Sequence, residues 1–507
     1  MFVCIDLFGL ITNDNLYTGN ILTVGRTVLI LFMTEAPAEL KKRARKLNDK
    51  SVRKTGKYVL CWLQQNLRAI DNPVIDGALA TANKLKLPVV VYHGLGQRYP
   101  QANDRLHRFI VEASRSLAPE VEARGLRCIN YIEGPAKYER GLVYRLAADA
   151  AAIITDDVPA FVARRQAESV AAKVDIAVIA MDVSCVVPMN EFPFLTEGNA
   201  FFRRAQTPFR EKYLAAKTEM LPDVSRYEAD FDFEPDDLSK LDIDKLIAEC
   251  DIDHTVLPVD EFSGARDAAL RRLKWACEKV LPVYERVRSN PSHPLSGTRL
   301  SPYMHFGILS VREVVWEIRK HATEKQNNWR ILDEIMSWRE FFHHQARFEP
   351  DPAAYETLPA WARETLEKHA FERVSDALTL SEIIHGETGD ETWDAAQKQY
   401  LTGGWMPNNI RMYWGKRLVG WRGTPQAAWR TACYLNNRFS LDGRDATTFG
   451  NIGWCFGKLN RPSGEHQIYG KVSRASDAVM RRRPGVPEWL ARQAARPAAR
   501  VFVPDKV

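Results

Sequence analysis

The chain has 507 residues, of which 45% are hydrophobic and 26% are charged. This ordinary composition excludes a disordered chain, a collagen and a simple coiled coil, and the length predicts two or three domains at roughly 150 residues each. Lysine and arginine outnumber acidic residues by 70 to 64, and this net charge of +6 permits a polyanionic partner without requiring one. The 8 cysteines are scattered, with no CxxC pair or Cys/His cluster. We therefore predict no metal site, no disulfide framework and a cytoplasmic location.

The first 32 residues match neither a membrane span nor a signal peptide. The apolar run at residues 27–33 is much shorter than the roughly 20 residues that a span needs. Asp6 and the polar residues 13–15 interrupt any apolar core that a signal peptide would have. We expect no membrane association. Residues 1–55 are interpreted as an N-terminal extension, in which residues 1–32 are either the product of an upstream start codon or a small packed segment.

Residues 56–187 alternate between short apolar runs and amphipathic segments. Strands are predicted at residues 58–62, 87–92, 127–132, 152–155 and 176–182, and helices at residues 73–85 and 104–117. Strands that alternate with helices form βαβ units, so this segment is predicted to be a parallel, Rossmann-like sheet covered by helices. Residues 64–68, after the first strand, lack the glycine-rich fingerprint of a dinucleotide site, which argues against a conventional NAD enzyme.

The second half of the chain changes character. Residues 188–262 are rich in proline and acidic residues and are predicted to be a long interdomain linker. Residues 263–475 have helical periodicity and are predicted to be an all-helical domain, followed by a basic C-terminal tail at residues 476–507. The predicted fold class is therefore α/β plus all-α.

Three segments of the helical half combine residue types that suit a ligand. Residues 296–307 place hydroxyl groups before a proline, as at a phosphate-binding helix start, although this segment taken alone favours a plain capped helix. Glu334 and Trp338 are four apart on one helix face, which suits a planar polar ring but also an ordinary core tryptophan. Arg411 and Asp442 are charges in apolar surroundings, where charges are usually paired.

Several of these blocks together resemble the photolyase/cryptochrome family, and in particular its class II DNA photolyases. The blocks are Leu300-Ser-Pro-Tyr-Met-His-Phe-Gly307, Ile410-Arg-Met-Tyr-Trp414, Tyr434-Leu-Asn-Asn-Arg438 and Asp442-Gly-Arg-Asp445, and the resemblance runs from about Tyr58 to Lys471. It implies an α/β antenna domain, a linker and a helical FAD-binding domain. It also implies a monomer that binds UV-damaged DNA and splits cyclobutane pyrimidine dimers by electron transfer from excited FADH⁻. A second, antenna chromophore such as a deazaflavin is compatible with it.

The resemblance also assigns site residues by position. Residues implied to bind the flavin are Tyr284, Thr298, Arg299, Leu300, Ser301, Arg339, Arg411, Asp442 and Gly443, and Asn436 is placed near flavin N5. Residues implied to bind the flipped dimer are Arg288, Trp338, Met412, Trp454 and Asn408, with Glu334 against the pyrimidine. Trp414, Trp393 and Trp421 match an electron-transfer triad, although a tryptophan-rich core is the alternative, since nine of the 13 tryptophans lie between residues 316 and 429.

One departure and two alternatives stand beside this prediction. Residues 405–408 read Trp-Met-Pro-Asn, where class II enzymes usually carry Lys-Met-His-Gly, so the chain resembles a divergent member. A cryptochrome-like blue-light photoreceptor would keep FAD and the triad while losing part of the dimer pocket. A DNA-binding protein with a purely structural flavin is the other alternative.

Overall fold

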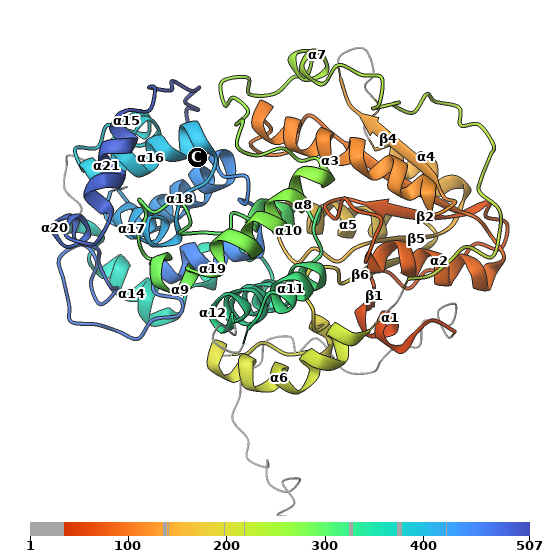
Figure 1. Cartoon of the computed structure of the whole chain (residues 1–507), viewed down its shortest axis with the longest axis horizontal. Coiled ribbons are helices and arrows are strands. Elements are labelled where there is room, and N and C mark those ends of the chain that lie inside the picture. The colour runs from red at the N-terminus through yellow and green to blue at the C-terminus, as the bar shows by residue number, and fades with distance from the viewer. Residues whose placement is uncertain are drawn as a thin grey trace, which may run out of the picture.

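The computed structural model describes residues 35–134, 139, 141–196, 198–216, 219–323, 328–372, 378–421 and 423–507. Residues 1–32, interpreted above as an upstream start or a packed segment, lie outside the described residues. Two domains lie side by side in Figure 1, the α/β domain on the right and the helical domain on the left. The predicted fold class is confirmed.

Six strands form one sheet in the order β1-β6-β5-β2-β3-β4. They are β1 (Ala44–Lys46), β2 (Tyr58–Leu63), β3 (Val89–Leu95), β4 (Arg127–Ile132), β5 (Ala150–Asp156) and β6 (Ala177–Met181). Neighbouring strands are parallel, except that β1 pairs antiparallel with β6. The five predicted strands are confirmed. β1 lies within the predicted N-terminal extension and was missed, because a three-residue strand of Ala, Arg and Lys has no apolar alternation.

Five helices belong to the α/β domain: α1 (Ala38–Arg43), α2 (Pro73–Leu85), α3 (Asp104–Ala123), α4 (Leu142–Asp149) and α5 (Phe161–Lys173). The start of α2 follows from local chemistry, since the Asn72 side chain accepts from the Val74 backbone N–H and Pro73 occupies the first turn. Residues 188–262 contain α6 (Asn199–Ala215) and α7 (Ile243–Ala248). In Figure 1, α6 lies below both domains and the chain returns over the top through α7.

The helices from α8 to α19 build the left-hand domain. They are α8 (Arg266–Trp275), α9 (Tyr284–Val287), α10 (Ser301–His305), α11 (Val311–Lys320), α12 (Trp329–Asp333), α13 (Glu340–Phe348), α14 (Ala360–Lys368), α15 (Leu380–His385), α16 (Glu391–Gly403), α17 (Asn408–Leu418), α18 (Pro425–Phe439) and α19 (Ala446–Cys455). Two π-helical segments, η3 (Ala276–Val280) and η4 (Glu334–Arg339), interrupt this series.

The segment predicted as a basic tail contains α20 (Asp477–Arg481) and α21 (Val486–Ala494). Trp489 of α21 is buried, and its indole N–H donates to Gln399 of α16 at 2.9 Å. Arg481 pairs with Asp477 and Glu391. These contacts pack the end of the chain onto the helical domain.

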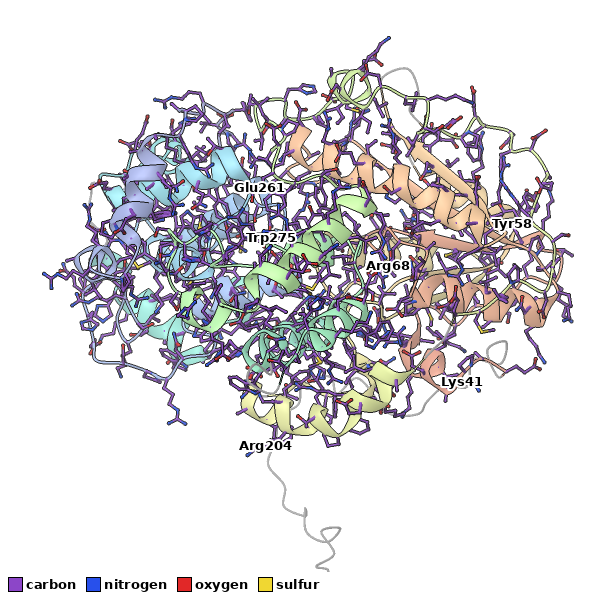
Figure 2. All side chains as sticks on the ribbon, viewed as in Figure 1. Lys41, Tyr58, Arg68, Arg204, Glu261 and Trp275 are labelled. Atoms are coloured by element: carbon purple, nitrogen blue, oxygen red, sulfur yellow. The ribbon has the colours of Figure 1, made fainter. Side chains whose placement is uncertain are left out.

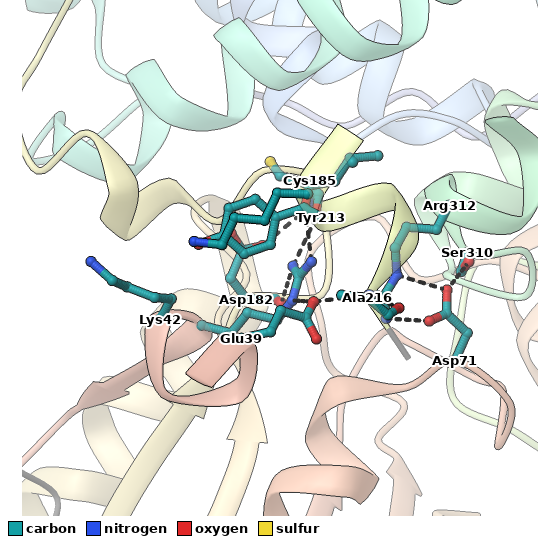
Figure 3. Close-up of polar contacts among 12 residues, drawn as sticks. Glu39, Lys42, Asp71, Asp182, Cys185, Tyr213, Ala216, Ser310 and Arg312 are labelled. Carbon is teal, nitrogen blue, oxygen red and sulfur yellow. Dashed lines mark hydrogen bonds and ion pairs between the residues drawn. The ribbon is translucent and has the colours of Figure 1, made fainter. Parts of the chain in front are cut away.

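One apolar cluster spans both domains, which are also joined by buried charges. Arg68, labelled in Figure 2 between the two halves, follows β2 and donates to the carbonyl of Gly307 at 2.8 Å. Arg312 of α11 pairs with Asp71 and with Glu39, the latter at 2.8 Å (Figure 3). Arg43 donates to the same Glu39 at 2.6 Å, so the carboxylates of the α/β domain and the guanidinium of the helical domain form one network.

Within the described residues, the helices all fall short of the length and apolarity that crossing a bilayer requires. The same part of the chain holds no group of three or more metal-ligating side chains, and the seven cysteines in it are free.

Candidate functional site

An ion pair in the helical domain joins α17 to the turn that follows α18. Arg411 of α17 holds Asp442 with nitrogen to oxygen distances of 3.0 and 3.3 Å, and the hydroxyls of Ser301 and Ser440 each donate to this carboxylate at 2.5 Å. Burial raises the pKa of Asp442, but Arg411 and the two hydroxyls offset this effect, and the pKa lies below its ordinary value. The carboxylate is therefore a fixed negative charge that orients the guanidinium.

Asn436 of α18 lies buried beside this pair with both ends of its amide bonded. The Tyr400 hydroxyl donates to Asn436 Oδ1 at 2.9 Å, and Asn436 Nδ2 donates to the Thr448 hydroxyl at 3.1 Å. The Arg411 guanidinium lies 5.6 Å from the centre of the Tyr400 ring. The orientation of the amide is thus set by a tyrosine from α16.

The Arg411 and Arg299 side chains each leave a buried Nε–H without a hydrogen-bond partner. Several other arginines of the described residues share this feature, but at Arg411 and Arg299 the free donor is available to an acceptor atom of a bound group. Arg299 also has a positive φ of 56°, lies over the Trp405 ring at 5.4 Å and pairs with Glu261. The donor set therefore fits a bound group rich in acceptor atoms, such as FAD.

Three tryptophans form a contiguous aromatic chain next to this site. The rings of Trp414 and Trp393 are stacked at 6.0 Å with an interplanar angle of 6°, and Trp393 meets Trp421 edge-on at 4.8 Å. Trp414 and Trp393 are fully buried, whereas Trp421 is half-buried. Tyr400 contacts the Trp414 ring edge-on at 5.4 Å, so the chain runs from Asn436 and Arg411 toward the surface.

A second cluster is built around Glu334, the first residue of the π-helical segment η4. The Tyr284 hydroxyl donates to one carboxylate oxygen, and Arg288 Nη2 lies 3.2 Å from the other. Burial raises the pKa of Glu334 above its ordinary value, although Tyr284 and Arg288 act in the opposite direction. Trp338, four residues later, stacks on Trp454 at 4.9 Å and 19°. A half-buried carboxylate thus lies near a flat aromatic wall.

Comparisons with known proteins agree with this architecture. The family model for DNA photolyase matches residues 59–225. The chain is 29% identical over 461 residues to a deoxyribodipyrimidine photo-lyase of Methanothermobacter thermautotrophicus, covering 89% of this chain and 98% of the relative. Over most of its length the chain is therefore similar to proteins of the photolyase/cryptochrome family.

Two solved structures extend the likeness to the fold. A class III photolyase from Agrobacterium tumefaciens aligns with a TM-score of 0.59 at 17% identity, covering 88% of this chain and 87% of the other. An archaeal photolyase from Sulfolobus tokodaii, described as holding two FAD molecules, aligns with a TM-score of 0.53 at 19% identity, covering 78% and 82%. The donor set described above fits a group of the kind that the Sulfolobus protein is described as holding.

The other predicted site residues lie at varied places in this family fold. Leu300 is buried at the start of α10, Thr298 and Met412 are half-buried, and Asn408 is exposed at the start of α17. Gly443 is packed so closely that an added Cβ would lie 2.5 Å from the Asn436 carbonyl oxygen. Arg339 donates to the carbonyl of Ser184, at the end of the α/β domain, which connects η4 to that domain.

The sequence prediction missed two side chains that hold the tryptophan chain and the amide. Tyr400 bonds Asn436, and Gln397 Oε1 accepts from the Trp414 indole at 3.0 Å. Gln397 and Tyr400 both lie on α16, four and seven residues after Trp393 respectively. Their helical spacing from Trp393 places them on one face, which is the one sequence signal that could have identified them.

A further cavity opens at the carboxyl ends of β2 and β3, between the domains. It is lined by residues from both, among them Gln64, Gln65, His93, Phe161, His305 and Arg444. Gln65 Nε2 donates to the His305 carbonyl at 2.7 Å, and His305 pairs with Asp445 at 3.1 Å. The carboxyl edge of a parallel sheet is the usual ligand site of such a domain.

Proposed function

We propose that the protein repairs cyclobutane pyrimidine dimers in DNA in a light-driven reaction, as a divergent class II photolyase. The observation that carries this proposal is the Glu334 cluster, in which one half-buried carboxylate is held by Tyr284 and Arg288 beside the stacked Trp338 and Trp454. A damaged, poorly stacked pyrimidine pair is cheaper to extrude from DNA than a normal pair. The aromatic wall would receive the flipped dimer.

Each residue of the cluster has a distinct task in this proposal. Glu334 would hydrogen-bond the polar edge of the pyrimidine and stabilise the negative charge that develops on it. Arg288, whose side chain is 32% exposed, can reach a backbone phosphate as well as Glu334. Met412 and the Trp338 and Trp454 rings would exclude water from the pyrimidine faces, and Asn408 is exposed where DNA would approach.

The flavin-binding residues would hold FAD through charge and shape. Arg411 and Asp442, with Ser301, Thr298, Arg299 and Gly443, would orient it, and Asn436 would present a neutral amide rather than a carboxylate to its redox-active ring. When bound and photoexcited in its reduced form, FAD supplies the electron that opens the cyclobutane ring. Trp414, Trp393 and Trp421 would deliver electrons from the surface during photoreduction.

We also propose that the cavity between the domains holds an antenna chromophore of the deazaflavin type. The lining carries one cation, Arg444, together with amides and imidazoles, and no carboxylate. Such a lining suits a planar, acceptor-rich or anionic ring. The protein would act as a monomer in the cytoplasm, where its free cysteines stay reduced.

The test is light-dependent recovery of thymine from an oligonucleotide that carries one cyclobutane thymine dimer. The photoreduced protein should restore the thymines in blue light and not in the dark. The Glu334→Ala variant should retain FAD and lose most of the repair. A protein that reduces its flavin normally and splits no dimer on single or double strands would instead support the photoreceptor alternative. An unrepaired lesion that wild type and Glu334→Ala bind equally would support the structural-flavin alternative.

A further inference from the structure

A tyrosine is linked to the outer end of the tryptophan chain through a buried carboxylate and an arginine. Tyr413 of α17 is 4% exposed, and its phenol oxygen lies 2.8 and 2.6 Å from the two carboxylate oxygens of Asp390. Asp390 is itself 8% exposed. Asp477 also approaches the phenol, at 3.4 Å. A buried phenol that donates to a carboxylate has a proton acceptor already in place.

Two further hydrogen bonds hold the Asp390 carboxylate in place, and each connects it to a tryptophan of the chain. As the N-cap of α16, it accepts from the Trp393 backbone N–H at 3.0 Å. It also accepts from Arg417 Nε at 2.7 Å, and the Arg417 guanidinium lies 5.4 Å from the centre of the Trp421 ring. Tyr413 and Arg417 are four residues apart and share a face of α17. The phenol, the carboxylate and Trp421 are therefore parts of one packed cluster.

We propose that Tyr413 is the terminal electron donor of the tryptophan chain and that Asp390 accepts its proton. This inference rests on the proposed photoreduction through Trp414, Trp393 and Trp421. Once oxidation has reached Trp421, one electron passes from the Tyr413 phenol to the Trp421 radical cation, and the phenolic proton passes to the Asp390 carboxylate. The products are neutral Trp421, a neutral tyrosyl radical and a neutral carboxylic acid. Electrons, protons and total charge balance in this step.

The geometry favours Tyr413 over Tyr400, whose ring contacts the tryptophan chain directly. Tyr400 contacts the Trp414 ring, but its hydroxyl donates to the amide of Asn436, which does not take up a proton. Oxidation of Tyr400 would leave a cation buried in the protein, whereas the Asp390 carboxylate neutralises the product of Tyr413 oxidation. Burial and Asp390 both raise the pKa of Tyr413, so the phenol keeps its proton until it is oxidised.

The test uses the full-length protein with oxidised FAD bound and no external reductant, excited by a short light pulse. Transient absorption should show a tryptophan radical that is replaced by a neutral tyrosyl radical. Ring-deuterated tyrosine should narrow the corresponding electron paramagnetic resonance signal. The Tyr413→Phe and Asp390→Asn variants should both lose the tyrosyl signal and keep the tryptophan radical. Asn at position 390 can still cap α16, so this variant preserves the helix start.

Tyr434→Phe is the matched control. It also removes a phenol from the helical domain, but the Tyr434 hydroxyl contacts Arg438 and not a carboxylate, so the tyrosyl signal should be unchanged. A wild-type protein without a tyrosyl radical, or a Tyr413→Phe variant that retains it, would overturn the inference. If Tyr413→Phe does not fold, loss or retention of the signal in Asp390→Asn decides. A wild-type protein that forms the tyrosyl radical and splits no dimer would refute the proposed repair function and leave this inference standing.

Discussion

At the residue scale, three effects act on the protonation of the Glu334 carboxylate. Burial favours its protonated form, while the Tyr284 hydroxyl and the Arg288 guanidinium favour the charged form. The side chain is 31% exposed, so a polar ligand can reach it. A carboxyl group in such a balance can accept a hydrogen bond from a pyrimidine or donate one to it.

We expect Glu334→Ala to slow dimer splitting by about tenfold or more, because a hydrogen bond to a charged group contributes about 1.5–3 kcal/mol. The measurement is thymine recovery under blue light with chemically reduced protein, normalised to FAD content. Glu278→Ala is the control, because this glutamate is 44% exposed and its ion pair with Lys274 is long, at 3.9 Å, and therefore weak. Equal repair by wild type and Glu334→Ala would contradict the assigned role.

At the element scale, two features position the site. The π-helical turn η4 projects Glu334 and Trp338 between α12 and α13, and such turns are frequent at functional sites. Glu340, directly after it, accepts from the Val186 backbone N–H at 2.7 Å and from the Gln206 amide, which anchors the turn to the end of the α/β domain and to α6. Helices α16 and α17 together hold the tryptophan chain.

The burial of Glu340 predicts that the free energy of unfolding depends on pH. Burial raises the pKa of Glu340 to about 8, from about 4.3 in an unfolded chain. Between these values the folded state binds more protons, so the free energy of unfolding should fall as pH rises, by at most about 1.4 kcal/mol per pH unit. Urea denaturation of Glu340→Gln across this range should show a shallower decline than wild type. An identical decline in both proteins would show that the pKa of Glu340 is not raised in the folded state.

The tryptophan chain predicts that two tryptophan variants differ in flavin photoreduction. Trp393→Phe should lose most of the flavin photoreduction, because Trp393 alone contacts both Trp414 and Trp421 among the ring contacts of the described residues. Trp429→Phe removes an equally buried indole outside the chain, so it should cost similar stability and leave photoreduction intact. The measurement that distinguishes the two variants is the rate of flavin bleaching under blue light with a reductant. Equal rates for the two variants would contradict electron transfer through Trp393.

At the scale of the whole molecule, buried charges hold the two domains in a fixed relation. Arg312 of α11 is 4% exposed and pairs with Glu39 and Asp71, both from the α/β half of the chain (Figure 3). Removal of one member of a buried ion pair leaves its partners uncompensated in a medium of low polarity. The cavity between the domains and the Arg339 contact to Ser184 both depend on this relation.

Arg312→Ala should therefore lower the free energy of unfolding by about 3–5 kcal/mol. Arg319→Ala, on the same helix, removes an exposed pair with Glu211 and should cost no more than about 1 kcal/mol. Urea denaturation of both variants measures the difference. Similar losses in the two proteins would mean that the network contributes no more than a surface pair.

Local chemistry made much of the fold predictable from the sequence. The start of α2 follows from Asn72 and Pro73, and the buried strands follow from their apolar runs. Contacts between distant segments were not predictable. Trp489 packs on α16, although its segment has the composition of a solvated tail. Asp390 is bonded by Tyr413 and Arg417, which lie on another helix. The motif residues Arg411 and Asp442 do meet in space, but Tyr400 and Gln397 required the structure.

The most direct measurement of the central claim is the number of dimers that one reduced protein molecule splits in blue light, without oxygen and without added reductant. Because the electron returns after each splitting, we predict many restored dimers per protein, and none in the dark. Recovery of no more than one dimer per protein would mean that the electron is consumed, and recovery of none would mean that the protein is not a photolyase.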